Sequence, residues 1–267
     1  MVKPLFIALG ILLSVNVFPQ ERQWNGKKCA VVLTYDDALN VHLDNVVPAL
    51  DAKGFKGTFY VMGSSDILSK RMSDWRNAAS EGHELGNHTL THPCDGNGRP
   101  FVNPETDLRL FTVERAVREI RVTNTLLKAI DGKDKRTFAY PCGNLKIGDS
   151  LFYPKVENEF PGARGVRAAM NTIHKVNLEN IDCYMINNNN AEYMIDLVKK
   201  AIDSKSLLVF LFHGVGGEHN INVDLAEHNK LIDFLKENEN MIWVAPMVEV
   251  TEYVKEYQKV KFISSNN

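Results

Sequence analysis

The sequence is poor in cysteine, has no excess of charge of either sign, and lacks a long apolar run beyond its first twenty residues. Lys and Arg total 31 against 33 for Asp and Glu, so no strong field gathers nucleic acid or an anionic membrane. Four cysteines in 267 residues are too few for a disulfide framework, so a hydrophobic core must hold the fold. No later segment is long and apolar enough to span a bilayer. We expect one soluble domain of barrel size that acts on a small or neutral molecule, and we predict no protein partner.

The first twenty residues have the pattern of a signal peptide. Lys3 is followed by an apolar run from Leu5 to Val17 and then by Phe18-Pro19-Gln20. Because the run is short for a membrane span, a retained N-terminal anchor is the weaker alternative. We therefore expect residues 1–20 to be removed on export, residues 21–267 to form the mature domain, and the protein to be periplasmic or extracellular.

Export would place the four cysteines in an oxidising compartment, where disulfides persist. They allow three pairings, and the sequence alone does not choose among them. Buried free thiols are an equal alternative. The cysteines are Cys29, Cys94, Cys142 and Cys183.

Short β-branched or aromatic runs alternate with stretches of helical spacing, which predicts a parallel sheet in an α/β fold. We expect strands at Ala30 to Tyr35, Gly57 to Met62, His83 to His88, Arg136 to Tyr140, Gly165 to Met170, Leu207 to Phe212 and Ile242 to Ala245. We expect helices at Asn45 to Lys53, Trp75 to Ser80, Glu105 to Ile130, Ala191 to Asp203 and Leu225 to Asn238, and a polar tail after Tyr253 that frays at its end. About seven such units predict a distorted (β/α) barrel of parallel strands in a single domain. An open doubly wound sheet is the alternative, because the sequence does not show closure.

Reactive polar residues follow several of the predicted strands, where an α/β sheet exposes side chains on a rigid support. Asp36 and Asp37 follow the first strand, and His88 and His92 follow the third. Two imidazoles four residues apart can face one ion, and a carboxylate completes the three protein ligands of a catalytic zinc site. Each feature also has a plain explanation, a helix cap or Asx turn for the aspartates and a solvated pair for the histidines. Together they predict that one aspartate binds a metal and the other takes a proton.

His213 ends an apolar strand and precedes the glycine-rich turn Gly214-Val215-Gly216-Gly217, which suits a proton donor. A capped core histidine is the alternative. We interpret His83, inside the third strand, as structural. The remaining histidines, for which we expect surface or packing roles, are His42, His174, His219 and His228.

From Cys29 to Tyr253 the chain resembles the NodB-type polysaccharide deacetylases, carbohydrate esterase family four. Thr34-Tyr35-Asp36-Asp37-Ala38 is similar to the family's Thr-Phe-Asp-Asp-Gly, and His88-Thr89-Leu90-Thr91-His92-Pro93 matches His-Ser/Thr-x-x-His-Pro throughout. Leu211-Phe212-His213 matches Leu-x-His. The resemblance implies that residues 21–267 form the catalytic domain, with Asp36 as base, His213 as acid, and Asp37, His88 and His92 as metal ligands.

The third motif departs from the family pattern Phe-Arg-Pro-Pro-Tyr-Gly, because this chain has Phe138-Ala139-Tyr140-Pro141-Cys142-Gly143. A backbone N–H at Cys142 still suits the oxyanion role that the resemblance implies. The arginine that steadies the base is missing at Ala139, and Arg167 is our candidate to replace it. Asp182 is our candidate for the residue that tunes the acid histidine, and Tyr140 for contact with substrate.

The resemblance implies an acetylated carbohydrate as substrate, either an N-acetylated polymer or an ester such as acetylated xylan. A non-catalytic carbohydrate-binding protein on the same barrel is the alternative of another class. One carboxylate and two imidazoles favour zinc, while cobalt, nickel and manganese suit similar ligands. We also expect Cys94 and Cys142 to lie near each other above the barrel, where a disulfide between them would brace the site.

Overall fold

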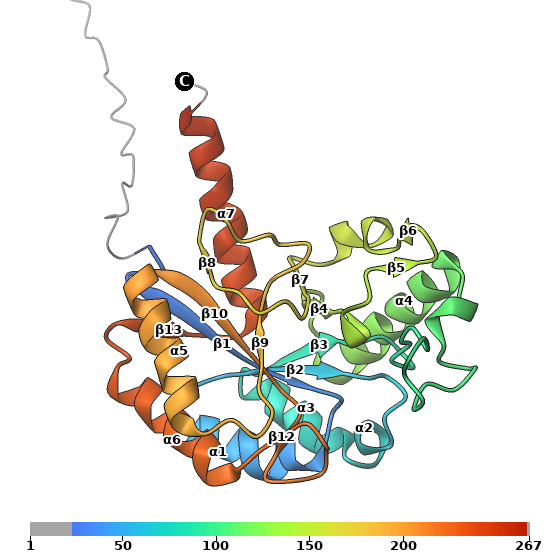
Figure 1. The fold of residues 1–267 in the computed structure, drawn as a ribbon, viewed down its shortest axis with the longest axis horizontal. Helices are drawn as coiled ribbons and strands as arrows, with labels where there is room; N and C mark the ends of the chain where they lie inside the picture. The colour runs from blue at the N-terminus through green and yellow to red at the C-terminus, as the bar shows by residue number, and fades with distance from the viewer. Residues whose placement is uncertain (1–22, 266–267) are drawn as a thin grey trace, which may run out of the picture.

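A mostly parallel sheet runs through the centre of the computed structural model, which describes residues 23–265 and side chains as far as residue 260 (Figure 1). The proposed signal peptide, residues 1–20, lies outside the described residues. The two longest strands are β1 (Cys29–Asp36) and β10 (Ser206–Phe212), which pair in parallel with Ala30 opposite Leu207 and Tyr35 opposite Phe212. Every residue of both strands is buried, as expected for strands covered on both faces.

Alternate residues of β1 enter two different cores, because successive side chains of a strand point to opposite faces. Val31 and Leu33 join the large core beneath the outer helices, whereas Ala30 and Val32 join a smaller core against the last helix. Asp36, six residues after Ala30, therefore points to the same inner face as Ala30 and Val32. This alternation places a carboxylate inside the curled sheet.

The sheet runs from β7 through β4, β3, β2 and β1 to β10, with all of these pairs parallel. It then curls back on itself, because Ile181 bridges Arg164 in parallel and β9 pairs with β10 three residues later. Two short strands extend the sheet at its edges, β13 beside the start of β1 and β8 antiparallel to β10. The strands not yet bounded are β2 (Thr58–Val61), β3 (Glu84–Asn87), β4 (Phe138–Ala139), β7 (Ala163–Arg164), β8 (Asn171–Thr172), β9 (Tyr184–Met185) and β13 (Ile242–Val244).

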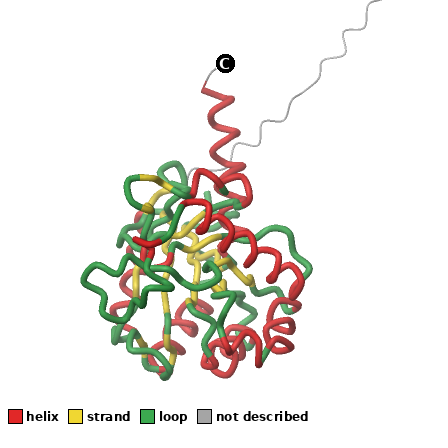
Figure 2. The backbone as a smooth tube through the Cα atoms, turned by 90° about the vertical axis from the view of Figure 1, so that its right-hand side faces the viewer, coloured by secondary structure: helices red, strands yellow, loops and turns green. Residues whose placement is uncertain are grey.

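Helices cover the outside of the sheet, and the last of them, α7, projects from the body (Figures 1 and 2). They are α1 (Val47–Asp51), α2 (Asp66–Lys70), α3 (Met72–Ser80), α4 (Val113–Asp131), α5 (Ala191–Ser204), α6 (Leu225–Glu237) and α7 (Met247–Ser265). A π-helical turn precedes α1 at His42–Val46, and 3₁₀ turns lie at Leu108–Leu110, Pro141–Gly143, Tyr153–Lys155 and Glu157–Glu159. Two small pairs of strands lie outside the main sheet: β5 (Lys146–Ile147) is antiparallel to β6 (Ser150–Leu151), and β11 (Gly214–Val215) is parallel to β12 (Asn222–Val223).

The predicted α/β fold with a curled, mostly parallel sheet is confirmed, and most of the expected elements are present. The strand expected at Gly165 to Met170 is wrong, because the strand is β7, just before it, and the chain from Gly165 to Met170 has no regular structure. The helix expected from Glu105 begins only at Val113, where Thr112 caps it by accepting from the Arg115 N–H. The polar tail after Tyr253 is helical as far as Ser265, in the helix α7, which we did not predict; the last two residues lie outside the described ones. No helix among the described residues is long and apolar enough to cross a membrane.

Candidate metal centre and active site

The carboxyl ends of neighbouring parallel strands bring the predicted site residues together. Asp36 is the last residue of β1 and Asp37 the next, His88 follows β3, and His213 follows β10. β2 lies between β1 and β3 in the sheet, and β10 pairs with the other edge of β1. His88 and His213, which follow Asp36 by 52 and 177 residues in the sequence, thus share one edge of the sheet with it.

Asp37, His88 and His92 offer ligand atoms that all lie within 4.8 Å of one another. The Oδ1 atom of Asp37 lies 3.7 Å from Nε2 of His88 and 3.7 Å from Nε2 of His92. These distances are too long for hydrogen bonds. They suit atoms that share an ion, since two ligands about 2.1 Å from a tetrahedral zinc lie roughly 3.4 Å apart.

The orientation of His88 provides the clearest test of whether this group fits a metal. Its Nδ1 lies 2.9 Å from the carbonyl oxygen of Ala139, so Nδ1 carries the proton and donates it. The other nitrogen, Nε2, therefore presents a lone pair, and this atom is buried without a hydrogen-bond partner among the described residues. Burial lowers the pKa of His88 to about 4, which keeps the ring neutral at pH 7. A neutral imidazole with a fixed, unsatisfied lone pair is the form that binds a divalent ion, and the residues fit one.

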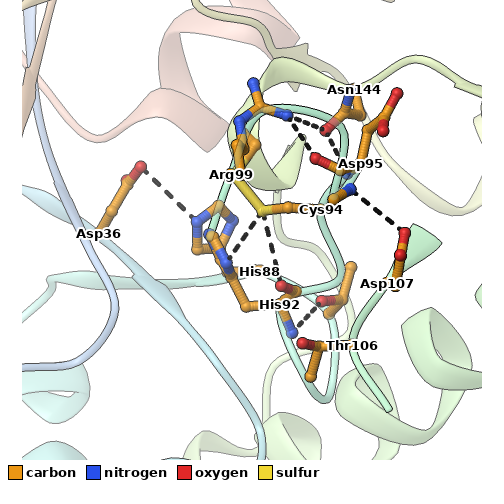
Figure 3. Close-up of a disulfide and its surroundings, with 12 residues drawn as sticks. Asp36, His88, His92, Cys94, Asp95, Arg99, Thr106, Asp107 and Asn144 are labelled. Atoms are coloured by element: carbon orange, nitrogen blue, oxygen red, sulfur yellow. Dashed lines mark hydrogen bonds and ion pairs between the residues drawn. A yellow bond between two sulfur atoms is a disulfide. The ribbon is translucent and has the colours of Figure 1, made fainter. Parts of the chain in front are cut away.

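His92 is held by the loop that follows β3 and by a disulfide (Figure 3). The Thr89 hydroxyl oxygen accepts from the His92 N–H at 3.0 Å, and both residues have positive φ, 64° and 53°. Two residues later, Cys94 is bonded to Cys142 in the turn after β4, as we expected. The disulfide joins the loop that carries His92 to the loop that carries the proposed oxyanion donor.

A second group that could bind a metal consists of His92, Cys94 and Cys142, whose ligand atoms also lie close together. The disulfide consumes both thiols, and a disulfide sulfur is not a thiolate ligand. We therefore assign the candidate metal centre to Asp37, His88 and His92.

Asp36 forms a buried ion pair with Arg164, the second residue of β7. Both carboxylate oxygens accept from Nη2 of Arg164 at 2.5 Å, and both residues are at most 2% exposed. Burial alone would raise the pKa of Asp36, but the charges of Arg164, His88 and His213 outweigh it and lower the pKa to about 2. Asp36 is therefore ionised at neutral pH. Its Oδ2 lies 3.7 Å from Nε2 of His88, directly beside the candidate metal centre.

Arg167, our candidate for the arginine missing at Ala139, is wrong for that role. Its side chain is 75% exposed and forms two hydrogen bonds of 2.7 and 2.6 Å with Asp182. Arg164 takes that place because the strand lies nearer the N-terminus than we expected, so that it ends at Arg164. Arg164 is the basic residue at the end of β7, and a correct strand end would have identified it from the sequence.

Asp182 and Tyr140 also have partners other than those we expected. The Asp182 carboxylate accepts hydrogen bonds from Arg167 and from the Asn171 amide, so these residues, and not His213, are its hydrogen-bond partners among the described residues. The Tyr140 hydroxyl donates to the carbonyl of Glu179 at 2.8 Å, and its ring packs among buried aromatic residues. Neither contact supports the roles in tuning the acid or contacting substrate.

His213 and His219 stack on each other beside Asp37. Their ring centroids are 4.6 Å apart with an interplanar angle of 14°, and Nε2 of each ring lies 3.9 Å from Oδ2 of Asp37. Burial lowers the pKa of His213, and the neighbouring charges of Asp36 and Asp37 oppose that effect. We expected only a surface or packing role for His219, because nothing in its sequence context predicts that the β11–β12 loop folds back over His213.

His42 holds the chain in place at the end of β10. Its Nε2 lies 2.8 Å from the carbonyl oxygen of His213, and its Nδ1 accepts from the Leu39 N–H. The ring is buried, which lowers its pKa to about 4. His42 thus joins the loop after β1 to the end of β10, a packing role of the kind we expected. His83 is likewise structural, since its Nδ1 accepts from the Gly57 N–H.

Strained backbone gathers around the site. Left-handed φ values at residues other than glycine cost free energy and persist where the surrounding structure imposes them. Six of the nine such residues in the described chain belong to the loops of this site: Asp37, Ala38, Thr89, His92, Cys142 and Glu218. The fold thus holds these loops in conformations that a free chain would avoid.

Comparisons with known proteins agree with the fold and the motifs. Residues 24–150 match the family model described as polysaccharide deacetylase. A gellan lyase from a Bacillus species is 29% identical over 154 residues, 58% of this chain and 5% of that protein. A chitooligosaccharide deacetylase from Sinorhizobium fredii is 32% identical over 99 residues, 34% of this chain and 45% of that protein. The chain thus spans less than half the length of either relative.

A solved structure extends the likeness beyond the region of the family model. The Xyl-CE4 domain of a multidomain xylanase from the hindgut metagenome of Trinervitermes trinervoides has a TM-score of 0.57 at 18% identity. The match covers 84% of this chain and 90% of that one, and it shows a shared fold. Residues 24–150 are thus similar to polysaccharide deacetylases, and the solved structure shows that the fold is shared over most of the chain.

Proposed function

We propose that the protein is a metal-dependent hydrolase that removes acetyl groups from a carbohydrate. The observation that carries this proposal is the convergence of Asp37, His88 and His92 around the unsatisfied Nε2 of His88, with the ionised Asp36 beside them. A divalent ion held by these three residues would acidify a water molecule and polarise the acetyl carbonyl. Zinc fits the ligand set best, with cobalt, nickel and manganese as alternatives.

Asp36 is the proposed general base. Its carboxylate is ionised and lies within 3.7 Å of His88, so it can take a proton from a water molecule at the metal centre. The pair of hydrogen bonds from Arg164 keeps the carboxylate charged and fixes its orientation. Arg164 therefore acts as a positioning residue.

His213 is the proposed general acid, which would protonate the departing sugar oxygen or nitrogen. It stands across Asp37 from the two histidine ligands. The backbone N–H of Cys142 is the proposed oxyanion donor, and the disulfide to Cys94 fixes its loop beside His92. Transfer of an acetyl group to water needs a base, then an oxyanion donor and then an acid, and Asp36, the Cys142 N–H and His213 are proposed for these three roles in that order.

The leaving group is proposed to be a sugar oxygen, with an amide nitrogen as the alternative. Nδ1 of His213 is buried without a hydrogen-bond partner among the described residues, so no carboxylate raises the basicity of its ring from that side. An amine leaving group depends more strongly on protonation by a general acid than an alcohol does. The unpaired Nδ1 of His213 therefore favours an acetylated glycan such as acetylxylan over an N-acetylated polymer.

A non-catalytic carbohydrate-binding protein is the rival from another class. The missing arginine at Ala139 was the feature that favoured it. The guanidinium of Arg164, on a different strand, binds Asp36 instead, so the missing arginine at Ala139 no longer favours a non-catalytic protein. We also propose that the protein works outside the cytoplasm, since residues 1–20 have a signal-peptide pattern.

Acetate release from N-acetylated chito-oligosaccharide and from acetylated xylan tests the proposal. The wild-type protein loaded with zinc should release acetate from at least one of them, and more rapidly from xylan. Asp36→Asn should retain the metal and lose at least about 10²-fold in rate, the usual contribution of a general base. If neither substrate yields acetate above the Asp36→Asn background, the protein is not a deacetylase of these glycans.

A further inference from the structure

Three N–H groups of the loop that carries the two histidine ligands donate to side chains. The Thr89 N–H donates to the Asn87 side-chain oxygen at 2.8 Å, and the His92 N–H donates to the Thr89 hydroxyl at 3.0 Å. The Thr91 N–H donates to Oε2 of Glu119 at 3.3 Å, and the Thr91 hydroxyl donates to the same oxygen at 2.7 Å. Asn87 and Thr89 lie beside the donors in the sequence, whereas Glu119 belongs to α4, 28 residues after Thr91.

His92 has less direct support than His88 (Figure 3). The ring of His88 is fixed through Nδ1 by the carbonyl oxygen of Ala139 at 2.9 Å. Among the described residues, Nδ1 of His92 has only the Cys94 sulfur as a partner, at 3.5 Å, and a disulfide sulfur is a weak acceptor. The side chain of His92 is also more exposed, at 24% against 2% for His88. The position of the His92 ring therefore depends on the backbone that carries it.

The backbone of His92 is in a conformation that the surrounding structure must impose. Its φ is 53°, and a residue other than glycine with positive φ costs free energy. Thr91 comes directly before His92, so the two hydrogen bonds from Thr91 to Glu119 fix the peptide that leads into this conformation. Hydrogen bonds to a carboxylate are stronger than those to a neutral oxygen, so they are able to hold a strained loop.

Glu119 reaches the loop from a rigid support. It is buried, at 7% exposed, and Nε of Arg115, one turn earlier on α4, lies 3.5 Å from its other oxygen. The helix is fixed to the end of β3, because the Asn87 amide donates to the Ile120 carbonyl oxygen at 2.8 Å and to the Asn124 side-chain oxygen at 2.7 Å. The carboxylate of Glu119 is therefore held in place on both sides of its contact with the loop.

We propose that Glu119 is a positioning residue for the metal centre, which holds Thr91 and through it directs the His92 ring toward the ion. The inference rests on the proposed metal-dependent function and adds to it a residue from outside the loops that carry the ligands. A ligand on a relaxed loop has to be ordered when the ion binds, and this ordering lowers the affinity. Glu119 keeps the loop ordered beforehand.

The test measures zinc affinity by calorimetry. Loss of a residue that orients a metal ligand typically weakens metal binding, so Glu119→Ala should bind zinc about 10- to 100-fold more weakly than wild type. Glu119→Gln retains an oxygen that accepts from Thr91 and should recover most of the affinity. The matched control on the same helix is Ile130→Val, which removes a methyl group from the large core and should lower Tm without changing zinc affinity.

A double-mutant cycle with Thr91→Val identifies the contact itself. Thr91→Val removes the hydroxyl that donates to Glu119, so it should also weaken zinc binding. Because both residues act through one contact, the double variant should lose less affinity than the product of the two single losses. Losses that multiply would show that Glu119 acts elsewhere, and the inference would fail.

Zinc binding is measured without turnover, which separates this inference from the proposed function. Tight binding by wild type and weak binding by Glu119→Ala support the positioning role even if wild type releases no acetate, in which case the deacetylase proposal alone fails. Equal zinc affinity in wild type and Glu119→Ala, or an equal loss in Ile130→Val, overturns the role of Glu119 and leaves the proposed function intact. A wild type without zinc affinity overturns both.

Discussion

At the scale of single residues, the pair of Asp36 and Arg164 determines the charge of the proposed base. Two charges taken out of water are stable together only when their hydrogen bonds are satisfied, and removing one leaves the other uncompensated. Arg164 meets this condition with two bonds of 2.5 Å to one carboxylate. The ion pair therefore keeps the buried Asp36 ionised and fixes the orientation of its carboxylate.

Replacing Arg164 by Gln should lower kcat/KM about 10²-fold at pH 7 and move the acid limb of the pH–rate profile to higher pH. The sign follows from the causes of the shift, because burial raises the pKa of Asp36 and the charge of Arg164 is the largest of the effects that lower it. Without that charge Asp36 holds its proton at higher pH. Arg167→Gln, which removes an exposed guanidinium, is the matched control and should behave as wild type. Overlapping profiles for Arg164→Gln and wild type would refute the role of the pair.

His219 is expected to position the ring of His213 by stacking. His219→Ala should lower kcat about ten-fold with unchanged metal content, since an acid that can rotate loses alignment with the leaving group. His219→Phe retains a flat ring and should recover most of the rate. If His219→Phe is as slow as His219→Ala, the imidazole itself is needed and stacking is not the explanation.

The sequence predicted the residues that belong to contiguous motifs and missed those that enter from elsewhere. Asp36, Asp37, His88 and His92 follow strong strands, so their convergence could be predicted from strand ends alone. Arg164 and His219 were missed because each depends on where a two-residue strand begins and ends. Strands of two residues are too short to show a hydrophobic periodicity in the sequence, so their bounds cannot be predicted from it.

At the scale of elements, the loops after β3 and β4 form one unit through the Cys94–Cys142 disulfide. A bridge between residues 48 apart restricts the unfolded chain and stabilises the fold by about 4 kcal/mol in the chain-entropy description. It also holds His92 and the Cys142 N–H, both on backbone of positive φ, in one arrangement. The same bond thus serves stability and site geometry.

Replacing both Cys94 and Cys142 by Ser should lower Tm and weaken zinc binding, measured by calorimetry, because the His92 loop becomes free to relax. Cys29→Ala is the control, since it removes a buried free thiol from the core and should lower Tm without changing zinc affinity. Thiol titration of the unfolded wild-type protein should find two groups before reduction and four after it. A double variant with wild-type zinc affinity would show that the disulfide does not brace the site.

Continuous apolar runs made the two long strands predictable, and the lack of such runs elsewhere explains the errors. β1 contains the apolar run Cys29–Leu33 and β10 the apolar run Leu207–Phe212, both buried on the two faces of the sheet, as only a covered strand tolerates. Gly165 to Met170 contains the same residue types but leaves Val166 45% exposed, so composition there did not indicate burial. The sheet curls back through one isolated bridge at Ile181 and a two-residue pairing of β9 with β10, which no local pattern reveals.

At the scale of the whole molecule, several histidines are buried in neutral form. Burial lowers the pKa of His42, His83 and His228 to about 4 in each case, against 6.5 in an exposed ring. Between pH 6.5 and 4 the unfolded chain binds protons at these histidines and the folded chain does not. The free energy of unfolding therefore falls as the pH falls through this window. Asp36 does not add to this loss until the pH is below its ordinary value of 3.8.

His228→Gln should therefore make Tm less dependent on pH between 6.5 and 4. His228 lies outside the proposed site and contacts the Tyr35 hydroxyl through Nε2 at 2.9 Å, a bond that a Gln side chain is able to replace. The stability lost by wild type across this window should be on the order of 3 kcal/mol larger than that lost by the variant. Parallel plots of Tm against pH would show that this ring is protonated at little cost in the folded protein.

The most direct test of the account is the zinc content of purified protein after exhaustive dialysis, measured for wild type, His88→Ala and Asp36→Asn. We predict one equivalent per chain in wild type and in Asp36→Asn, and little in His88→Ala, because Nε2 of His88 is the buried, unpaired atom that the proposed ion would satisfy. Full zinc occupancy in His88→Ala, or none in wild type after loading with zinc, would contradict the assignment of Asp37, His88 and His92 as a metal centre.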